Sequence, residues 1–128
     1  MQEGTAVSMR VRYVVLYVTD VELCCRFWVD QVGMVEKDRK DLGDFAVVHV
    51  GFADQPFAFE LVPLAMMADN PYGLNLGSPS VALQAEDLEA AHAQLAARGV
   101  TVMEIGEHGG VRSFAFSDPE GRWFAMTA

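Results

Sequence analysis

The sequence predicts an α+β fold in which a β-α-β-β-β module occurs twice along 128 residues. Two observations support this prediction. Hydrophobic periodicity gives strands and helices in the same order in both halves. Short motifs also recur: Thr19–Leu23 (TDVEL) matches Glu86–Ala90 (EDLEA), with the two aspartates 67 positions apart, and Val32–Val35 matches Arg98–Thr101 at 66 positions. A repeat of this kind indicates a unit that buries its hydrophobic face against its copy.

The first module begins with a β-branched and aromatic strand that leads into a capped helix. Thr19 and Glu22 have the spacing of a capping box, and Gly33 is a typical helix end. The expected elements are a strand over Val11–Val18, a helix from Thr19 to about Val32, a polar segment over Met34–Lys40 that could form a strand, a turn over Asp41–Asp44, and strands over Phe45–Val50 and Phe57–Val62.

The second module repeats this order. Asp87 starts its helix and Gly99 ends it, with His92 on the helix face directed away from the expected cavity. Asp118-Pro119-Glu120-Gly121 has the residue preferences of a β-turn. The expected elements are strands over Ser80–Gln84, Val100–Ile105, Arg112–Ser117 and Arg122–Ala128, a helix over Asp87–Arg98 and a flexible turn over Gly106–Gly110.

The module boundaries follow from these elements. Residues 1–8 are expected to be a loose leader, because they lack the basic and apolar regions of a signal peptide. Residues 9–128 are expected to form a single domain, with module one at about 10–62, a linker at 63–79 and module two at about 80–127. We expect the two modules to form a curved mixed sheet around an inner cavity, with the helices outside. Several linker residues are apolar and could cover a cavity or an interface, although simple packing is the favoured interpretation: Leu64, Met66, Met67, Tyr72 and Leu74.

Composition excludes some classes of partner. Nine basic against 18 acidic residues give a net charge of −9, which argues against a nucleic-acid partner, because phosphate binding depends on clustered Lys and Arg. No apolar run reaches the length of about 18 residues needed to span a membrane. Cys24 and Cys25 are the only cysteines, and adjacent cysteines cannot join distant elements, so a reducing cytoplasm is expected.

Glu60 is the first candidate for a functional residue, because it lies within an apolar strand. An isolated charge there is costly unless it is paired, metal-bound or neutralised. By the alternation of strand side chains it shares a face with Ala58, and the same reasoning places Tyr13, Val15 and Tyr17 on the inner face of the first strand. Ser80 and Arg112 complete the predicted inner face. Arg112 belongs to it only if its strand has the register that we assume.

The duplicated pattern resembles the vicinal oxygen chelate superfamily, which contains glyoxalase I, extradiol dioxygenases and bleomycin-resistance proteins. The residues that carry the resemblance extend over about 10–127: Tyr13–Asp20 (YVVLYVTD), Phe27-Trp28 before Gly33, Asp87–Ala91 leading to Arg98–Val100, and Asp118–Gly121. This resemblance implies the fold more strongly than an activity, because one fold supports many functions. It also implies a homodimer.

The metalloenzymes of that superfamily hold their metal with four inward ligands. By the resemblance, these positions correspond to Tyr13, Glu60, Ser80 and Ala125 here, and only Glu60 is a usual ligand. All four, Ala125 included, are expected to belong to the ligand-binding face. A catalytic metal site normally needs about three protein ligands, so we expect no metal and no other cofactor. Tyrosine can bind ferric iron as phenolate, so a metal site that includes Tyr13 is the less favoured alternative to a metal-free protein. His49 lies on a middle strand and could face either way; a packed or exposed histidine is favoured over a ligand.

Two classes of function follow from the predicted face. The first is a metal-free protein that binds an aromatic or cationic organic molecule, as the resemblance to antibiotic-sequestering members implies. The second is an enzyme in which Glu60 acts as an acid or base or as a residual metal ligand. Tyr13 and Tyr17 could instead be ordinary packing residues, and Glu60 could pair with Arg112 or contact water.

Overall fold

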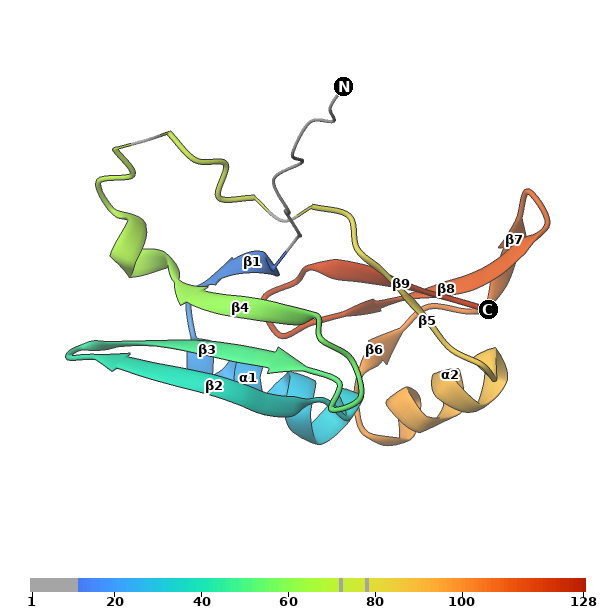
Figure 1. Ribbon diagram of the computed structural model, residues 1–128. Coiled ribbons are helices and arrows are strands. Elements are labelled where there is room, and N and C mark those ends of the chain that lie inside the picture. Colours follow the sequence, from blue (N-terminus) through green and yellow to red (C-terminus); the bar gives the residue numbers. More distant parts are fainter. Residues whose placement is uncertain (1–11, 72, 78) are drawn as a thin grey trace, which may run out of the picture.

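The computed structural model describes residues 12–71, 73–77 and 79–128, so the predicted leader at 1–8 and Tyr72 lie outside the described residues. It confirms the α+β fold with its repeated order of elements (Figure 1). The elements are β1 (Tyr13–Val18), α1 (Val21–Arg26), the π-helix η1 (Phe27–Val32), β2 (Val35–Leu42), β3 (Phe45–Gly51), β4 (Ala58–Pro63), the 3-10 helix η2 (Leu64–Met67), β5 (Ala82–Gln84), α2 (Leu88–Ala97), β6 (Thr101–Val102), β7 (Gly106–His108), β8 (Val111–Ser117) and β9 (Trp123–Thr127).

The strands form two sheets of matching topology. Sheet A has the order β1-β4-β3-β2, and sheet B has the order β5-β9-β8-β6 with β7 added beside β8. The first strand of each module pairs in parallel with the last, and the other pairs are antiparallel. Helices α1 and α2 lie against the same side of the two sheets (Figure 1). We call the opposite side of each sheet its inner face.

Asp87 starts the second helix as the sequence predicts. The predicted capping box of Thr19 and Glu22 was wrong: Asp20 is the N-cap of α1, and the Thr19 hydroxyl instead donates to Glu120. The Asp20 side chain accepts a hydrogen bond from the Leu23 amide at 3.0 Å, and Asp87 accepts one from the Ala90 amide at 3.0 Å. The first helix continues as η1, in which the Trp28 carbonyl accepts from the amides of both Gly33 and Met34. Gly33 then ends the helix with φ of 102°, a conformation that glycine adopts without a Cβ clash.

One aromatic cluster joins the two modules. Trp28 is fully buried, and its ring centroid lies 5.0 Å from that of Phe59, 6.1 Å from that of Phe116 and 4.9 Å from that of Phe124. These rings come from η1 and β4 of module one and from β8 and β9 of module two. Burial of large aromatic side chains stabilises the fold by several kcal/mol per ring, about 3–5 by the cost of truncating one to alanine.

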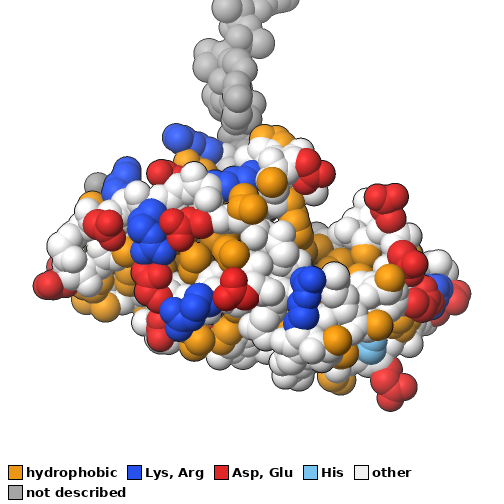
Figure 2. Space-filling view, turned by 90° about the horizontal axis from the view of Figure 1, so that it is seen from below, with side chains coloured by type: hydrophobic (Ala, Val, Ile, Leu, Met, Phe, Trp, Pro, Cys, Tyr) orange, Lys and Arg blue, Asp and Glu red, His pale blue; other side chains and the backbone are white. Residues whose placement is uncertain are grey.

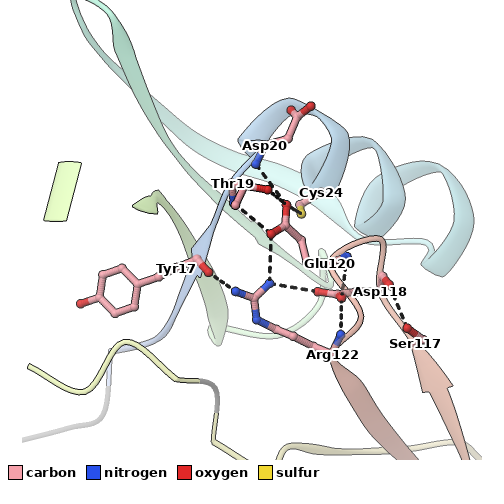
Figure 3. A network of polar contacts seen from close by, with 8 residues as sticks. All are labelled: Tyr17, Thr19, Asp20, Cys24, Ser117, Asp118, Glu120 and Arg122. Carbon is pink, nitrogen blue, oxygen red and sulfur yellow. Dashed lines mark hydrogen bonds and ion pairs between the residues drawn. The ribbon is translucent and has the colours of Figure 1, made fainter. Parts of the chain in front are cut away.

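A polar network makes a second connection between the modules (Figure 3). It joins the Asp118–Arg122 turn of module two to the segment between β1 and α1. Glu120 accepts hydrogen bonds from the Thr19 amide at 2.9 Å, the Thr19 hydroxyl at 2.7 Å and the Asp20 amide at 3.1 Å. The Arg122 guanidinium donates to the backbone carbonyl of Tyr17. The turn therefore holds the end of β1 in place.

Several predicted boundaries were wrong. Gly106–His108 was predicted to be a turn and instead forms β7, because Gly109 and Gly110 adopt φ of 58° and 79° and close a tight hairpin with β8. Strand β2 extends through Leu42 into a predicted turn, and β5 and β6 are shorter than expected. Among the described residues, no helix is long and apolar enough to cross a membrane.

Candidate functional site

A cavity of about 560 Å³ lies on the inner face of sheet A. This volume is in the range of small-molecule sites. Its lining combines apolar and aromatic side chains with a small number of charged groups. The lining residues are Arg12, Tyr13, Val15, Tyr17, Asp38, Lys40, Leu42, Val47, His49, Glu60, Val62, Met66, Met67 and Leu74. All of them belong to module one or the linker.

The most distinctive polar feature of this cavity is a pair formed by His49 and Glu60. The two residues are direct neighbours across the antiparallel strands β3 and β4, so their side chains emerge on the same face. The His49 Nε2 lies 2.8 Å from the Glu60 Oε2. The side chains are 13% and 24% exposed, which leaves both open to a ligand in the cavity. The lone carboxylate of this apolar strand thus has a partner, and that partner is a histidine.

An aromatic wall adjoins the pair. The Tyr13 ring lies 4.2 Å from the His49 ring, centroid to centroid, at an interplanar angle of 44°. The Arg12 guanidinium lies 4.9 Å from the centroid of the Tyr13 ring, within the range of a cation–π interaction. The Tyr17 side chain also lines the cavity, whereas its carbonyl accepts from Arg122 in the polar network, as Figure 3 shows.

The linker covers one side of the cavity. Met66 and Met67 reach it from η2, which follows β4 directly, and Leu74 reaches it from further along the linker. Two hydrogen bonds position Leu74: the Asn70 side-chain amide donates to the Leu74 carbonyl at 2.9 Å, and the Leu74 amide donates to the Asn70 side chain at 3.0 Å. Flexible methionine side chains adapt to ligands of irregular shape, which suits a covering element.

The structure brings together four of the predicted site residues and separates the others. Tyr13, Val15, Tyr17 and Glu60 line the cavity. Ala58 lies on the same face of β4 but is buried and does not line the cavity. Ser80 precedes β5 and Ala125 lies on β9, so both belong to module two and are absent from the lining.

The predicted position of Arg112 was wrong. On β8 it alternates in phase with Phe114 and Phe116, which are buried in the core on the helix side of sheet B. Its guanidinium forms an ion pair with Glu89 of α2. The register of β8 with its neighbours, which the sequence does not give, decides this orientation. Arg112 is therefore not the partner of Glu60.

His49 is the residue that sequence reasoning left unassigned. The sequence shows that side chains alternate along its strand, but not which set of side chains faces the cavity. The loop between β3 and β4 is compatible with several registers, and the register decides the face. The structure gives the register: His49 opposes Glu60, and Val48 and Val50 on the other face are fully buried. A polar residue between buried valines was the available signal.

The two thiols lie outside the cavity and are not poised for reaction. Burial raises the pKa of Cys24 to about 12, and the nearby Glu120 carboxylate contributes to this shift. Burial also raises the pKa of Cys25 to about 11, together with its contact to Glu36. Both cysteines are free and buried. His92 is likewise structural, since its Nε2 lies 2.9 Å from the Met103 carbonyl and its ring packs against Phe114.

The structure thus combines a duplicated βαβββ fold with a cavity on the inner face of its first sheet. The chain belongs to the Glyoxalase/Bleomycin resistance protein/Dioxygenase superfamily, whose family model matches residues 10–126. No curated protein matches the chain.

Solved structures show the same fold at low sequence identity. TnmS3, an antibiotic binding protein from Streptomyces sp. CB03234, has a TM-score of 0.77 and 23% identity over 97% of this chain and 98% of its own. A superfamily member from Sphaerobacter thermophilus DSM 20745 has a TM-score of 0.78 and 23% identity over 94% and 97%. A glyoxalase I mutant from Zea mays has a TM-score of 0.73 and 21% identity, covering 92% of this chain and 44% of its own.

The metal site of the superfamily's enzymes does not fit the residues present. Of the four corresponding positions, Tyr13 and Glu60 line the cavity, whereas Ser80 and Ala125 lie in module two. Glu60 directs one carboxylate oxygen at His49. Within the part of the chain that the structure describes, no group of three or more His, Cys, Asp or Glu residues could hold a metal ion. The donor set thus falls short of the three ligands that a catalytic site normally uses.

Proposed function

We propose that this protein binds a small organic molecule, aromatic or cationic, in the cavity on sheet A and does so without a metal ion. The observation that carries the proposal is the His49–Glu60 pair set among apolar and aromatic side chains in a cavity of about 560 Å³. A few polar groups on an apolar surface are the usual composition of a ligand site, since the apolar part supplies affinity and the polar part supplies orientation. The antibiotic binding protein among the structural neighbours is consistent with this function.

Metal analysis combined with a thermal-shift screen tests the proposal. We expect purified protein to contain less than stoichiometric zinc, nickel, iron or manganese, and its melting temperature to rise with some aromatic or cationic antibiotics. A ligand that binds the folded state alone raises stability with its concentration. A stoichiometric metal that is lost from the Glu60→Gln variant would contradict the metal-free function.

An enzyme is the second candidate, favoured by the contact between His49 and Glu60. A histidine held by a carboxylate is the arrangement of many acid–base catalysts. The Glu60→Gln variant separates the two candidates. A binding protein should lose part of its affinity, whereas an acid–base enzyme should lose turnover and keep most of its affinity.

We also propose that the protein acts as a homodimer. Among the described residues, those that line the cavity belong to module one and the linker, while the inner face of sheet B carries exposed apolar side chains. Trp123 and Val111 lie on this face and are 50% and 52% exposed. Exposed apolar surface of this kind suits a second copy. Sedimentation at several concentrations tests the assembly, and a monomer at all of them would contradict it.

A cytoplasmic location and the absence of a nucleic-acid partner complete the proposal. Two free buried cysteines are consistent with a reducing compartment. The net charge is −9, and in Figure 2 basic side chains on the face seen from below lie among acidic ones. Electrophoretic mobility of DNA and RNA should therefore be unchanged by the protein.

A further inference from the structure

The hydrogen-bond pattern of the His49–Glu60 pair defines which groups a ligand meets on the cavity floor. An ionised carboxylate only accepts, so the hydrogen between the Glu60 Oε2 and the His49 Nε2 belongs to the histidine. The second carboxylate oxygen of Glu60 accepts hydrogen bonds as well. The pair on the cavity floor therefore offers an acceptor to a ligand group that donates a hydrogen.

The charges around the pair argue against a cation as that donor. Asp38 and Glu60 carry negative charge in the cavity lining, and Arg12 and Lys40 carry positive charge. The formal charges of these four side chains cancel, although the whole chain carries −9. A cationic ligand would gain little from such a balanced set and would compete with His49 for Glu60. A neutral donor, such as a hydroxyl group, meets no such competition.

The walls of the cavity specify the rest of the ligand. Tyr13 and Tyr17 present aromatic surface from β1, and Met66 and Met67 present polarisable side chains from the linker. Flat aromatic rings pack well against both kinds of surface. We propose that the cavity selects a neutral aromatic compound that bears a hydroxyl group and donates its hydrogen to the His49–Glu60 pair. This inference rests on the proposed binding function and narrows it to one class of ligand.

Three naphthalene compounds distinguish the contribution of a hydroxyl donor to binding from that of the aromatic rings. Naphthol carries the hydroxyl donor, methoxynaphthalene has the same rings without a donor, and naphthylmethylammonium carries a positive charge. Titration calorimetry at neutral pH should give naphthol an affinity about tenfold or more above that of methoxynaphthalene, the effect expected for a hydrogen bond to a charged acceptor. The cation should bind less tightly than naphthol.

Two variants assign the difference to the pair. Glu60→Gln and His49→Gln should each remove most of the preference for naphthol and leave the affinity for methoxynaphthalene within about twofold. Glu89→Gln, which breaks the ion pair with Arg112 on the outer side, serves as the matched control and should change neither affinity. Circular dichroism of each variant checks that it folds, and His49→Gln replaces Glu60→Gln if the latter does not.

The possible results test the preference for a hydroxyl group separately from the proposed binding function. If all three compounds bind with equal affinity, or if the cation binds most tightly, the preference for a hydroxyl group is overturned while the binding function stands. If the naphthol preference survives in both variants, the assignment to His49 and Glu60 is overturned. If none of the three compounds binds, the aromatic ligand of the proposed function falls together with this inference.

Discussion

Thr19 and Glu120 lie 101 positions apart and are joined by two hydrogen bonds, of 2.9 Å from the Thr19 amide and 2.7 Å from its hydroxyl. Glu120 of module two thus accepts hydrogen bonds from groups that lie just before α1 in module one. Arg122, next to the same turn, donates to the backbone carbonyl of Tyr17, whose side chain lines the cavity. The turn of module two therefore helps to position a residue of the site.

Glu120→Gln should destabilise the protein by about 1–3 kcal/mol at pH 7, because it removes a charged acceptor from a half-buried network. Urea denaturation followed by tryptophan fluorescence measures the change. Glu89→Gln is the control, since the Glu89–Arg112 pair is exposed and should contribute much less to stability. Equal effects of the two substitutions would mean that the network does not connect the modules energetically.

The contribution of Glu120 should depend on pH. Burial raises the pKa of this carboxyl, but the hydrogen bonds from Thr19 and Asp20 outweigh burial and the net shift is downward. A lowered pKa stabilises the folded state above the unfolded value of about 4.3, and this stabilisation is lost as pH falls through the folded pKa. The gap in stability between wild type and Glu120→Gln should therefore narrow as pH falls from 5 toward 3. A constant gap would contradict this assignment. Burial raises the pKa of Asp118, so this residue changes stability with pH in the opposite direction. Because Asp118 is present in both proteins, it does not affect the difference between them.

Phe124→Ala should cost about 3–5 kcal/mol, since it empties one position in the aromatic cluster around Trp28. The stacked partner Phe116, 5.6 Å away between centroids, would lose its contact as well. Thermal unfolding measures the loss. Leu23→Ala on α1, where the side chain is 42% exposed, is the control and should cost far less. A small effect of Phe124→Ala would show that the modules do not depend on this shared cluster.

The two thiols should react slowly in the folded protein. Their pKa values of about 12 for Cys24 and about 11 for Cys25 leave little thiolate near neutral pH, and the thiolate is the reactive form. Reaction with a disulfide reagent at pH 8 should be at least about a hundredfold slower than in denaturant. Rapid modification of either thiol without denaturant would contradict the buried positions.

Arg112→Gln should leave ligand binding unchanged, because this side chain lies on the helix side of sheet B and pairs with Glu89. Stability should change little, because exposed ion pairs contribute little to it. The calorimetric titration with naphthol provides the measurement. A marked loss of affinity would place Arg112 in the site and restore the orientation that the sequence had suggested.

The internal repeat could be read from the sequence because each of its signals is local. Asp20 and Asp87 act as helix caps, Gly33 ends a helix in the left-handed conformation, and the strands follow side-chain alternation. Such features depend on the conformational preferences of a few neighbouring residues, which the same few residues encode. The inner face of β1, with Tyr13, Val15 and Tyr17, followed from the same alternation.

Glu60 was recognised from sequence as a charge that needed a partner, but only the tertiary structure decided which partner it has. Arg112, the predicted partner, and His49, whose face was left open, both lie on strands whose register the sequence does not give. A shift of one residue turns every side chain of a strand to the other face. The antiparallel pairing of β3 with β4 placed His49 beside Glu60, and the pairing of β8 turned Arg112 to the helix side. Local preferences thus determined the elements and their repeat, whereas contacts between distant strands determined the composition of the cavity.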